Sequence, residues 1–316
     1  MKKLRTPRFA PLALTGALLV GGLGSAWNLQ NGASAPEASA VETTTAASHS
    51  LSTARAMPAV VERRELDLPN LDNPRVDHWV ERFTGSLRPD LEIRLERMGR
   101  YEEMISRKLA ERDMPQDLVY LAMMESGFSP TAFSSASASG LWQFMPATGK
   151  HYGLDINRAV DERNDPELAT DAALDYLDRL HDRFGSWYLA AAAYNCGQGR
   201  LARIMRQHTG RVKGTDADFY AIARYLPGET REYVPRIIAA ARIGHDREGF
   251  GFDDVKPQPA PVYQLVEVAP ATPLAEIARA HGTTVATIRD LNPQLKIDRV
   301  RNDERARVRV PAGTRT

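Results

Sequence analysis

The sequence predicts an all-α central domain followed by a small β-α-α-β module. Three observations predict this fold class. Apolar residues recur at three- and four-residue spacing over residues 74–246, and no segment there alternates like a strand. A Pro-rich stretch, 247–260, follows, and after it two alternating segments flank two short helical ones. The 316 residues are enough for one large domain and one small one.

The N-terminal segment has the layout of a secretory signal. Four basic residues within the first eight positions precede a mostly apolar run over 9–23, and small residues follow that run. We therefore expect a cleaved signal over residues 1–26 and export to the periplasm or cell wall, with no stable membrane span after cleavage. The alternative is an uncleaved segment that keeps the protein associated with the membrane.

Residues 27–73 form a predicted disordered linker. From Trp27 to Pro58 the chain is rich in Ala, Ser, Thr, Pro and Glu and has almost no large apolar side chain. Such a segment buries too little surface to offset the entropy of ordering it.

The central domain, 74–246, is predicted to be helical throughout. Apolar positions from Leu91 to Leu109 predict one amphipathic helix that ends near Asp113, and the next helix is expected over 116–125, before Gly127. Further helices, each bounded by Gly, Pro, Asp or Asn, are expected over 166–184, 188–194, 199–208 and 230–243.

The C-terminal module, 261–313, follows the Pro-rich spacer 247–260, which we expect to be extended. Its predicted elements, in β-α-α-β order, are a strand over 262–266, helices over 274–281 and 285–291, and a closing strand over 307–311.

Composition narrows the class of partner. The formal net charge is +1, whereas a nucleic-acid-binding protein carries a strong basic excess. The seven His residues show no metal-ligand spacing and there is one Cys, so no metal or other cofactor is expected. A single cysteine excludes an intramolecular disulfide, and we expect Cys196 to be buried and unreactive.

Glu125 is the candidate catalytic residue. It ends the apolar run LVYLAMMESGF, and a loop of small residues and then the apolar cluster 141–145 follow it. Desolvation raises the pKa of a carboxyl group, and an acid at a helix C-terminus is further disfavoured in its ionised form. These features indicate general-acid catalysis on a large, hydroxyl-rich substrate. Most glycosidases use two carboxylates, but the next acid along the chain is Asp155.

Three motifs carry a family resemblance. They are Glu125-Ser126 with Ser134 nine residues on and GLWQFMP at 140–146, then AYNCG at 193–197, then ETREYV at 229–234. Through them the chain resembles the lytic murein transglycosylases with a goose-lysozyme-like catalytic domain, most of all the membrane-bound lytic murein transglycosylase D branch. It departs from that pattern at Ser137, where the family usually has Gly, and at Cys196, where Ala is usual. Gly accepts positive φ more readily than Ser, but Gly140 of the same turn is kept, so the substitution at Ser137 does not weaken the resemblance.

The resemblance implies a lysozyme-like fold and cleavage of the MurNAc-GlcNAc β-1,4 bond of peptidoglycan glycan strands without hydrolysis. Glu125 would act first as acid and then as base, with the substrate acetamide in place of a second carboxylate. The products are 1,6-anhydroMurNAc ends.

The resemblance also assigns substrate contacts. Ser134 is expected to bond the acetamide or the C6 hydroxyl region, Gln143 to contact a saccharide, and Met145 to line the sugar subsites. Tyr194 is expected to point its hydroxyl toward Glu125. The remaining assignments are Asn195, which shapes the turn after Tyr194, and Tyr233, near the acetamide site.

Alternatives remain open. Glu229 begins a predicted helix, where an acid is favoured structurally, but it would serve as a base if the enzyme were a hydrolytic muramidase. A peptidoglycan-binding protein without activity is a third reading. The sequence gives no indication of oligomeric state, or of endo- or exo-cleavage.

The C-terminal module resembles a LysM domain, a module that binds N-acetylated glycans. Asn292-Pro293 after its second helix and Val308–Pro311 carry the resemblance. The Gly-Asp-Thr-Leu usual at the start of the first helix is replaced by Ala271-Thr272-Pro273-Leu274, which bears on glycan affinity more than on fold.

Overall fold

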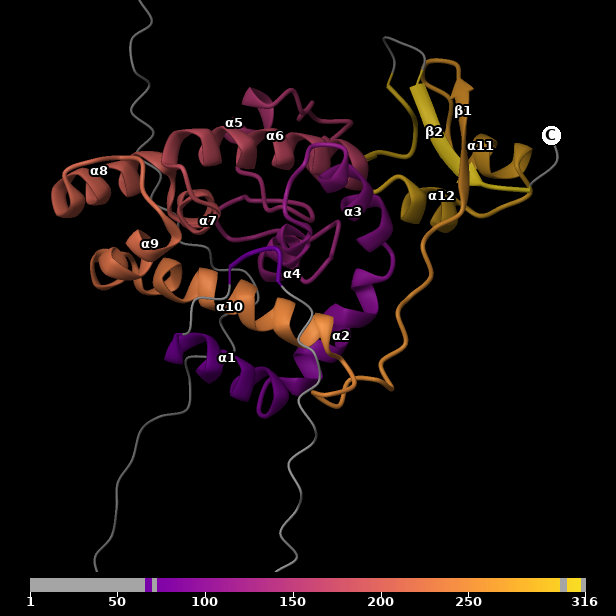
Figure 1. The fold of residues 1–316 in the computed structure, drawn as a ribbon. Helices are drawn as coiled ribbons and strands as arrows, with labels where there is room; N and C mark the ends of the chain where they lie inside the picture. The colour runs from indigo at the N-terminus through magenta and orange to yellow at the C-terminus, as the bar shows by residue number, and fades with distance from the viewer. Residues whose placement is uncertain (1–65, 70–72, 302–305, 314–316) are drawn as a thin grey trace, which may run out of the picture.

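A computed structural model describes residues 66–69, 73–301 and 306–313. The predicted signal 1–26, and the linker apart from 66–69 and Asn73, lie outside the described residues. Figure 1 shows a helical body and, beside it, a small module at the C-terminal end. The all-α body and the β-α-α-β order of the module are confirmed. The helices of the body are α1 (Pro74–Thr84), α2 (Arg88–Met98), α3 (Glu102–Ala110), α4 (Val119–Ser126), α5 (Pro146–His151), α6 (Pro166–Phe184), α7 (Trp187–Cys196), α8 (Gln198–Thr209), α9 (Asp216–Ile222) and α10 (Gly228–His245), with 3-10 turns at Gln116–Leu118, Glu162–Asn164 and Ala223–Tyr225.

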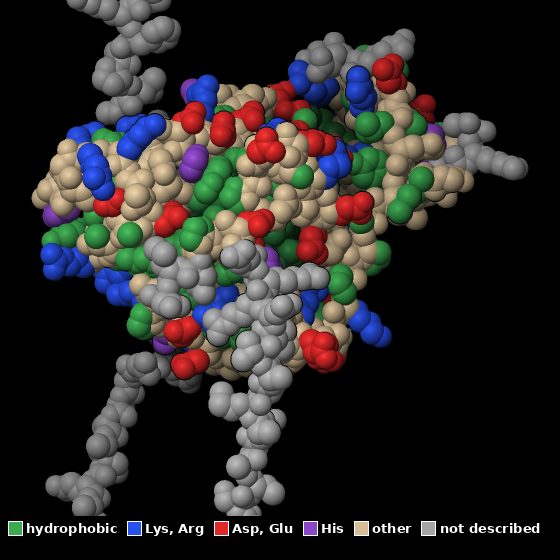
Figure 2. Space-filling model, viewed as in Figure 1, with side chains coloured by type: hydrophobic (Ala, Val, Ile, Leu, Met, Phe, Trp, Pro, Cys, Tyr) green, Lys and Arg blue, Asp and Glu red, His purple; other side chains and the backbone are tan. Residues whose placement is uncertain are grey.

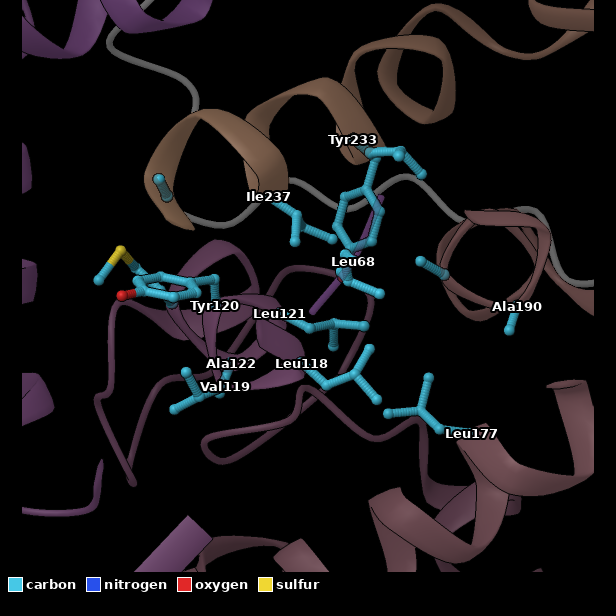
Figure 3. Packing of buried hydrophobic residues seen from close by; sticks show 14 of the residues in the cluster. Leu68, Leu118, Val119, Tyr120, Leu121, Ala122, Leu177, Ala190, Tyr233 and Ile237 are labelled. Atoms are coloured by element: carbon cyan, nitrogen blue, oxygen red, sulfur yellow. The ribbon is translucent and has the colours of Figure 1, made fainter. Parts of the chain in front are cut away.

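The core of the body forms around α4 and α7, the two most apolar helices. Helix α7 packs against α6, α8, α9 and α10, and its run of four alanines, Ala190–Ala193, is buried and lets neighbouring helices approach closely. Helix α10 lies against α1, α4 and α7. Figure 3 shows Tyr233 and Ile237 of α10 facing Leu118 and Leu121 in this core.

The prediction of one long helix from Leu91 to near Asp113 is wrong. The chain forms α2 and α3 with a break at Gly99–Tyr101. The spacer crosses this break, since the backbone N–H of Gln258 donates to the carbonyl of Glu96 at 2.8 Å. A Cβ at Gly99 would lie 2.5 Å from the carbonyl oxygen of Gln258, so the close approach requires glycine there. Apolar spacing continues across the break and hides it in the sequence.

Helix α1, which the Asn73 side chain caps, and two short helices were not individually predicted. Helix α5 starts at Pro146, a residue suited to the first helical turn. Helix α9 starts with a capping box, in which the Thr215 hydroxyl and the Asp218 carboxylate bond each other's backbone N–H groups. Apolar periodicity gives little signal over six or seven residues.

The C-terminal module consists of β1 (Tyr263–Val268), α11 (Leu274–Ala280), α12 (Val285–Leu291) and β2 (Ala306–Pro311). The strands are antiparallel, with Tyr263 opposite Pro311. Both helices pack against the same small core, and one member of that core comes from the helical body. The core residues are Val160, Leu274, Ile277, Ala278, Ile288, Leu295, Val300, Val308 and Val310.

The module is docked on the body through the loop 155–161. Val160 forms a β-bridge with Leu295, and the N–H of Asp161 donates to the carbonyl of Gln294 at 2.9 Å. Arg309 of β2 makes a bidentate ion pair with Asp165, at 2.7 and 2.9 Å, and both side chains are nearly buried. We call this set of contacts the module interface.

The outer surface carries both signs of charge. On the face in Figure 2, acidic and basic side chains are interspersed over the helical body, which agrees with the near-zero net charge. Within the described ranges, none of the helices combines the length and the apolar character needed to cross a membrane.

Candidate active site

Glu125 lies one residue before the end of α4, where the chain leaves the core. Gly127 caps the helix in the left-handed conformation, with φ of 57°. The Ser126 hydroxyl donates to the carbonyl of Leu141 at 2.9 Å and ties the helix end to the loop that follows. Glu125 is partly exposed as a residue, while its carboxyl group is buried against the core.

Burial raises the pKa of the Glu125 carboxyl to about 8. A hydrogen bond from Tyr233 acts in the opposite direction, because it favours the ionised form, while the negative charge of Glu229 raises the pKa further. Burial is the largest of these effects. The carboxyl group is therefore mostly protonated at neutral pH, as a general acid requires.

The hydrogen bond to Glu125 comes from Tyr233 and not from Tyr194, of which it was expected. The hydroxyl of Tyr233, on α10, donates to Oε1 of Glu125. The hydroxyl of Tyr194, on α7, donates instead to the carbonyl of Trp142 at 2.7 Å. Burial raises the pKa of both phenols well above the usual value, so both stay protonated donors. Tyr194 thus fixes the apolar cluster beside Glu125, and Tyr233 touches the acid.

Asn195 links the second motif to the third. Its Nδ2 donates to Oε1 of Glu229 at 3.3 Å, and its Oδ1 accepts from the Thr230 hydroxyl at 2.6 Å. Asn195 is therefore a cross-link between α7 and the first turn of α10 rather than only a turn residue. Glu229 is exposed, one helical turn before Tyr233, and its charge acts on Glu125.

The loop 133–144 folds back on itself through β-bridges of Ser139 with Phe133 and with Phe144. Ser134 is 1% exposed, and its Oγ accepts from the N–H of Ala138 at 3.0 Å, so it lies inside the loop. Nε2 of Gln143 donates to the carbonyls of Ala132 and Gly140. These two predicted substrate contacts hold the loop in shape.

Two residues of this loop have strained backbones. Ser137, which stands where the family pattern usually has Gly, has φ of 68°, and Gln143 has φ of 47°. The carbonyl of Ser137 accepts a hydrogen bond from Arg163 at 2.6 Å. The loop geometry is therefore imposed by its surroundings.

Arg163 is the site residue that sequence reasoning missed. It is 4% exposed, forms a bidentate pair with Asp161, and donates to the carbonyls of Ser137 and Phe144. Its own carbonyl packs against Gly140, where a Cβ would come within 1.7 Å. The only signal was a lone basic residue within the acidic run DERND.

The other predicted residues of the region are structural or peripheral. Trp142 is fully buried and donates to the Thr170 hydroxyl at 2.9 Å. Met145 is partly exposed, next to α5. Cys196 is buried, as expected, and burial raises the pKa of its thiol to about 11, which makes it a poor nucleophile. The described side chains include no group of three or more His, Cys, Asp or Glu that would hold a metal ion.

Comparison with known protein families identifies the part of the chain that carries most of this site. Residues 103–215 match the family described as the transglycosylase SLT domain. This part of the chain belongs to the transglycosylase SLT domain family. The SLT domain holds Glu125, the loop 133–144 and Asn195, while Glu229 and Tyr233 lie beyond the matched residues.

Two proteins that are similar to this chain are named lytic murein transglycosylases. The chain is 32% identical to membrane-bound lytic murein transglycosylase D of Escherichia coli K12 over 73% of its length and 50% of that protein. It is 30% identical to the soluble lytic murein transglycosylase of the same strain over 44% of its length and 22% of that protein. The 70 kDa soluble lytic transglycosylase SLT70 of Escherichia coli, a solved structure, matches with a TM-score of 0.42 and 27% identity over 56% of this chain and 29% of that one. The chain thus spans about half the length of transglycosylase D.

Proposed function

We propose that this protein is a peptidoglycan lytic transglycosylase that cleaves the MurNAc-GlcNAc β-1,4 bond without hydrolysis. The observation that carries the proposal is Glu125, a carboxyl with a pKa of about 8 that receives a hydrogen bond from Tyr233. A pKa near the working pH lets one group give a proton and then take one back. The names of the similar proteins support the same substrate.

In the first step, protonated Glu125 gives its proton to the glycosidic oxygen, and the bond between that oxygen and the MurNAc anomeric carbon breaks. The carbonyl oxygen of the MurNAc acetamide bonds to the anomeric carbon and takes the place of a second protein carboxylate. Glu125 is now ionised, and the Tyr233 hydroxyl stabilises that form through its hydrogen bond.

In the second step, the Glu125 carboxylate takes the proton of the MurNAc C6 hydroxyl. The C6 oxygen bonds to the anomeric carbon and displaces the acetamide oxygen, which gives the 1,6-anhydro ring. Glu125 ends protonated, as it began, and no water is consumed.

The roles of the residues around Glu125 are assigned from their exposure and from their hydrogen bonds. Gln143 and Met145 are partly exposed and are proposed to contact the sugars. Ser134, Tyr194 and Asn195 are proposed to position the cleft walls through their buried hydrogen bonds. Glu229 supports the hydrolytic alternative, since it is an exposed acid whose charge reaches Glu125.

The envelope is the proposed place of action, in line with the membrane-bound relative and with the signal-like segment 1–26. We propose that the module formed by residues 261–313 is a LysM-like unit that acts together with the SLT domain on the same glycan.

The test is mass spectrometry of the soluble products from purified peptidoglycan. Products one water lighter than hydrolytic fragments, lost in Glu125→Gln and kept in the exposed-residue control Glu81→Gln, are expected. Full-mass reducing ends would instead establish hydrolysis and direct attention to Glu229. Absence of products from the unmodified protein would leave glycan binding without catalysis.

A further inference from the structure

A cavity of about 370 Å³ lies where the SLT domain, the spacer and the C-terminal module meet. Its apolar wall includes Tyr101, Phe128 and Pro293, and three guanidinium groups line it, from Arg97, Arg100 and Arg289. Of the residues that the structure describes, Asp290 is the one acid that lines it. The cavity is therefore cationic, with a surface on which an apolar or aliphatic body packs.

A second cavity on the other side of the Arg100–Asp290 pair differs in charge. It has three arginines but also three acids, and its acids are Glu103, Glu167 and Asp290. The excess of positive charge is thus specific to the first cavity and is not a general property of the junction.

The arginines of the first cavity are not equally available. Arg100 is paired with Asp290 at 2.9 Å, and Arg289 is paired with Asp298. Among the described residues, the Arg97 guanidinium has no acidic partner. It is partly exposed at the C-terminal end of α2. A guanidinium with a free fork binds a carboxylate in bidentate fashion.

Part of the cavity wall follows Glu125 closely in the chain. Gly127 and Phe128 both have φ of 57°, so the chain turns sharply after Glu125. The next residues, 128–131, then line the cavity. A left-handed conformation is uncommon for an aromatic residue, and such strain is concentrated where a chain shapes a ligand site.

We propose that this cavity binds a carboxylate-bearing peptide stem of peptidoglycan, with Arg97 as the carboxylate contact. The inference rests on the proposed function, because that function supplies a glycan with peptide stems near Glu125. The uncharged sugar backbone gives a cationic cavity nothing to pair with, whereas the stems carry free carboxylates next to aliphatic side chains. The site would make the enzyme prefer strands that keep their stems.

The experiment measures binding to the full-length chain carrying Glu125→Gln, so that turnover does not interfere. Two glycan oligomers of equal length are compared. One carries peptide stems, and from the other an amidase has removed the stems and the lactyl carboxylates that this exposes have been capped as methylamides. Stem-bearing oligomers are expected to bind more tightly, and Arg97→Ala to reduce that preference about five- to tenfold. Arg206→Ala, an exposed arginine on α8, should leave it unchanged.

A third ligand identifies the chemistry. Stems whose carboxyl groups are amidated should bind like stem-free glycan if the carboxylate is what Arg97 recognises. The inference is overturned if Arg97→Ala and the parent chain show the same preference, or if amidated stems bind as well as free ones, or if an anionic polymer such as polyphosphate competes more strongly than stems.

The proposed function is read separately, from the products that the unmodified protein forms on stem-free glycan. Anhydro ends there together with an unchanged stem preference in Arg97→Ala would refute only the stem site. Absence of any anhydro ends would refute the transglycosylase proposal itself, whatever the binding result.

Discussion

The Tyr233 hydroxyl donates to Oε1 of Glu125, so two motifs 108 residues apart meet at one carboxyl group. The bond favours the ionised carboxylate and burial favours the neutral acid. Because burial has the larger effect, the acid is protonated at rest, and Tyr233 limits how far its pKa rises. The residue pair therefore sets the pH range in which Glu125 can both give and accept a proton.

Glu125→Gln should abolish product formation and raise thermal stability in a pH-dependent way. The folded protein keeps this proton up to a pKa of about 8, against 4.5 for an unperturbed Glu. The stability that the neutral acid supplies is thus complete below about pH 4.5 and is lost as pH rises toward 8, at about 1.4 kcal/mol per pH unit at most. The gain in Tm of the variant over the unmodified protein should grow across this range in thermal melts. A constant difference would contradict the raised pKa.

Tyr233→Phe should shift the pH–rate profile upward. The hydroxyl lowers the pKa of Glu125, so its loss should move the alkaline limb of kcat to higher pH by about one unit, since hydrogen bonds to charged groups contribute about 1.5–3 kcal/mol. The rate at the optimum should fall about tenfold or more because the carboxylate formed in the first step loses its donor. Tyr225→Phe, at an exposed tyrosine stacked on His208, is the control.

Arg163→Met should destabilise the protein by about 3–5 kcal/mol, because it leaves Asp161 buried without its partner and frees two loop carbonyls. Urea unfolding measures the loss. Arg107→Met removes an ion pair to Glu111 in which both side chains are more than half exposed, and should change stability by less than about 1 kcal/mol. Equal effects of the two variants would show that the buried contacts of Arg163 contribute no more to stability than an exposed ion pair.

Ser137→Gly should stabilise the protein by about 1 kcal/mol, since Gly adopts a φ of 68° without the steric cost that a Cβ adds. Ala136→Gly, at a neighbouring position whose φ is not positive, should be destabilising because Gly has more backbone freedom to lose. Denaturant midpoints of the two variants that moved in the same direction would argue against strain at Ser137.

Arg309→Met should open the module interface. It leaves the buried Asp165 carboxylate unpaired, although that group still caps α6 by accepting from the N–H groups of Glu167 and Leu168. Limited proteolysis within the spacer 247–260 should become at least several times faster. Arg301→Met, which removes a more exposed pair with Asp155, should have a smaller effect.

The sequence predicted most helices because apolar spacing and Gly or Pro stops suffice for them. The span predicted over 166–184 is that of α6. The break at Gly99 could not be predicted, since it depends on the spacer that crosses there. Apolar periodicity carries no information about a contact between segments distant in the chain.

The candidate site was also predicted only in part. Glu125 was predicted because an acid at the end of an apolar helix is unusual, and the motif match named its neighbours. Which tyrosine reaches Glu125 depends on the packing of α7 against α10, so the contact expected of Tyr194 is made by Tyr233 instead. Arg163 had no motif, and its role appears only when Asp161 and two loop carbonyls surround it.

Val160 gives the module a further property. It belongs to the core of a unit formed by residues a hundred positions further along, so the module cannot complete its own core without the body. The spacer 247–260 adds a second attachment, because Phe252 is buried in the core of the body and Gln258 is hydrogen-bonded to Glu96. The two units therefore keep their mutual orientation through packing at both connections, and losing either one leaves the other in place.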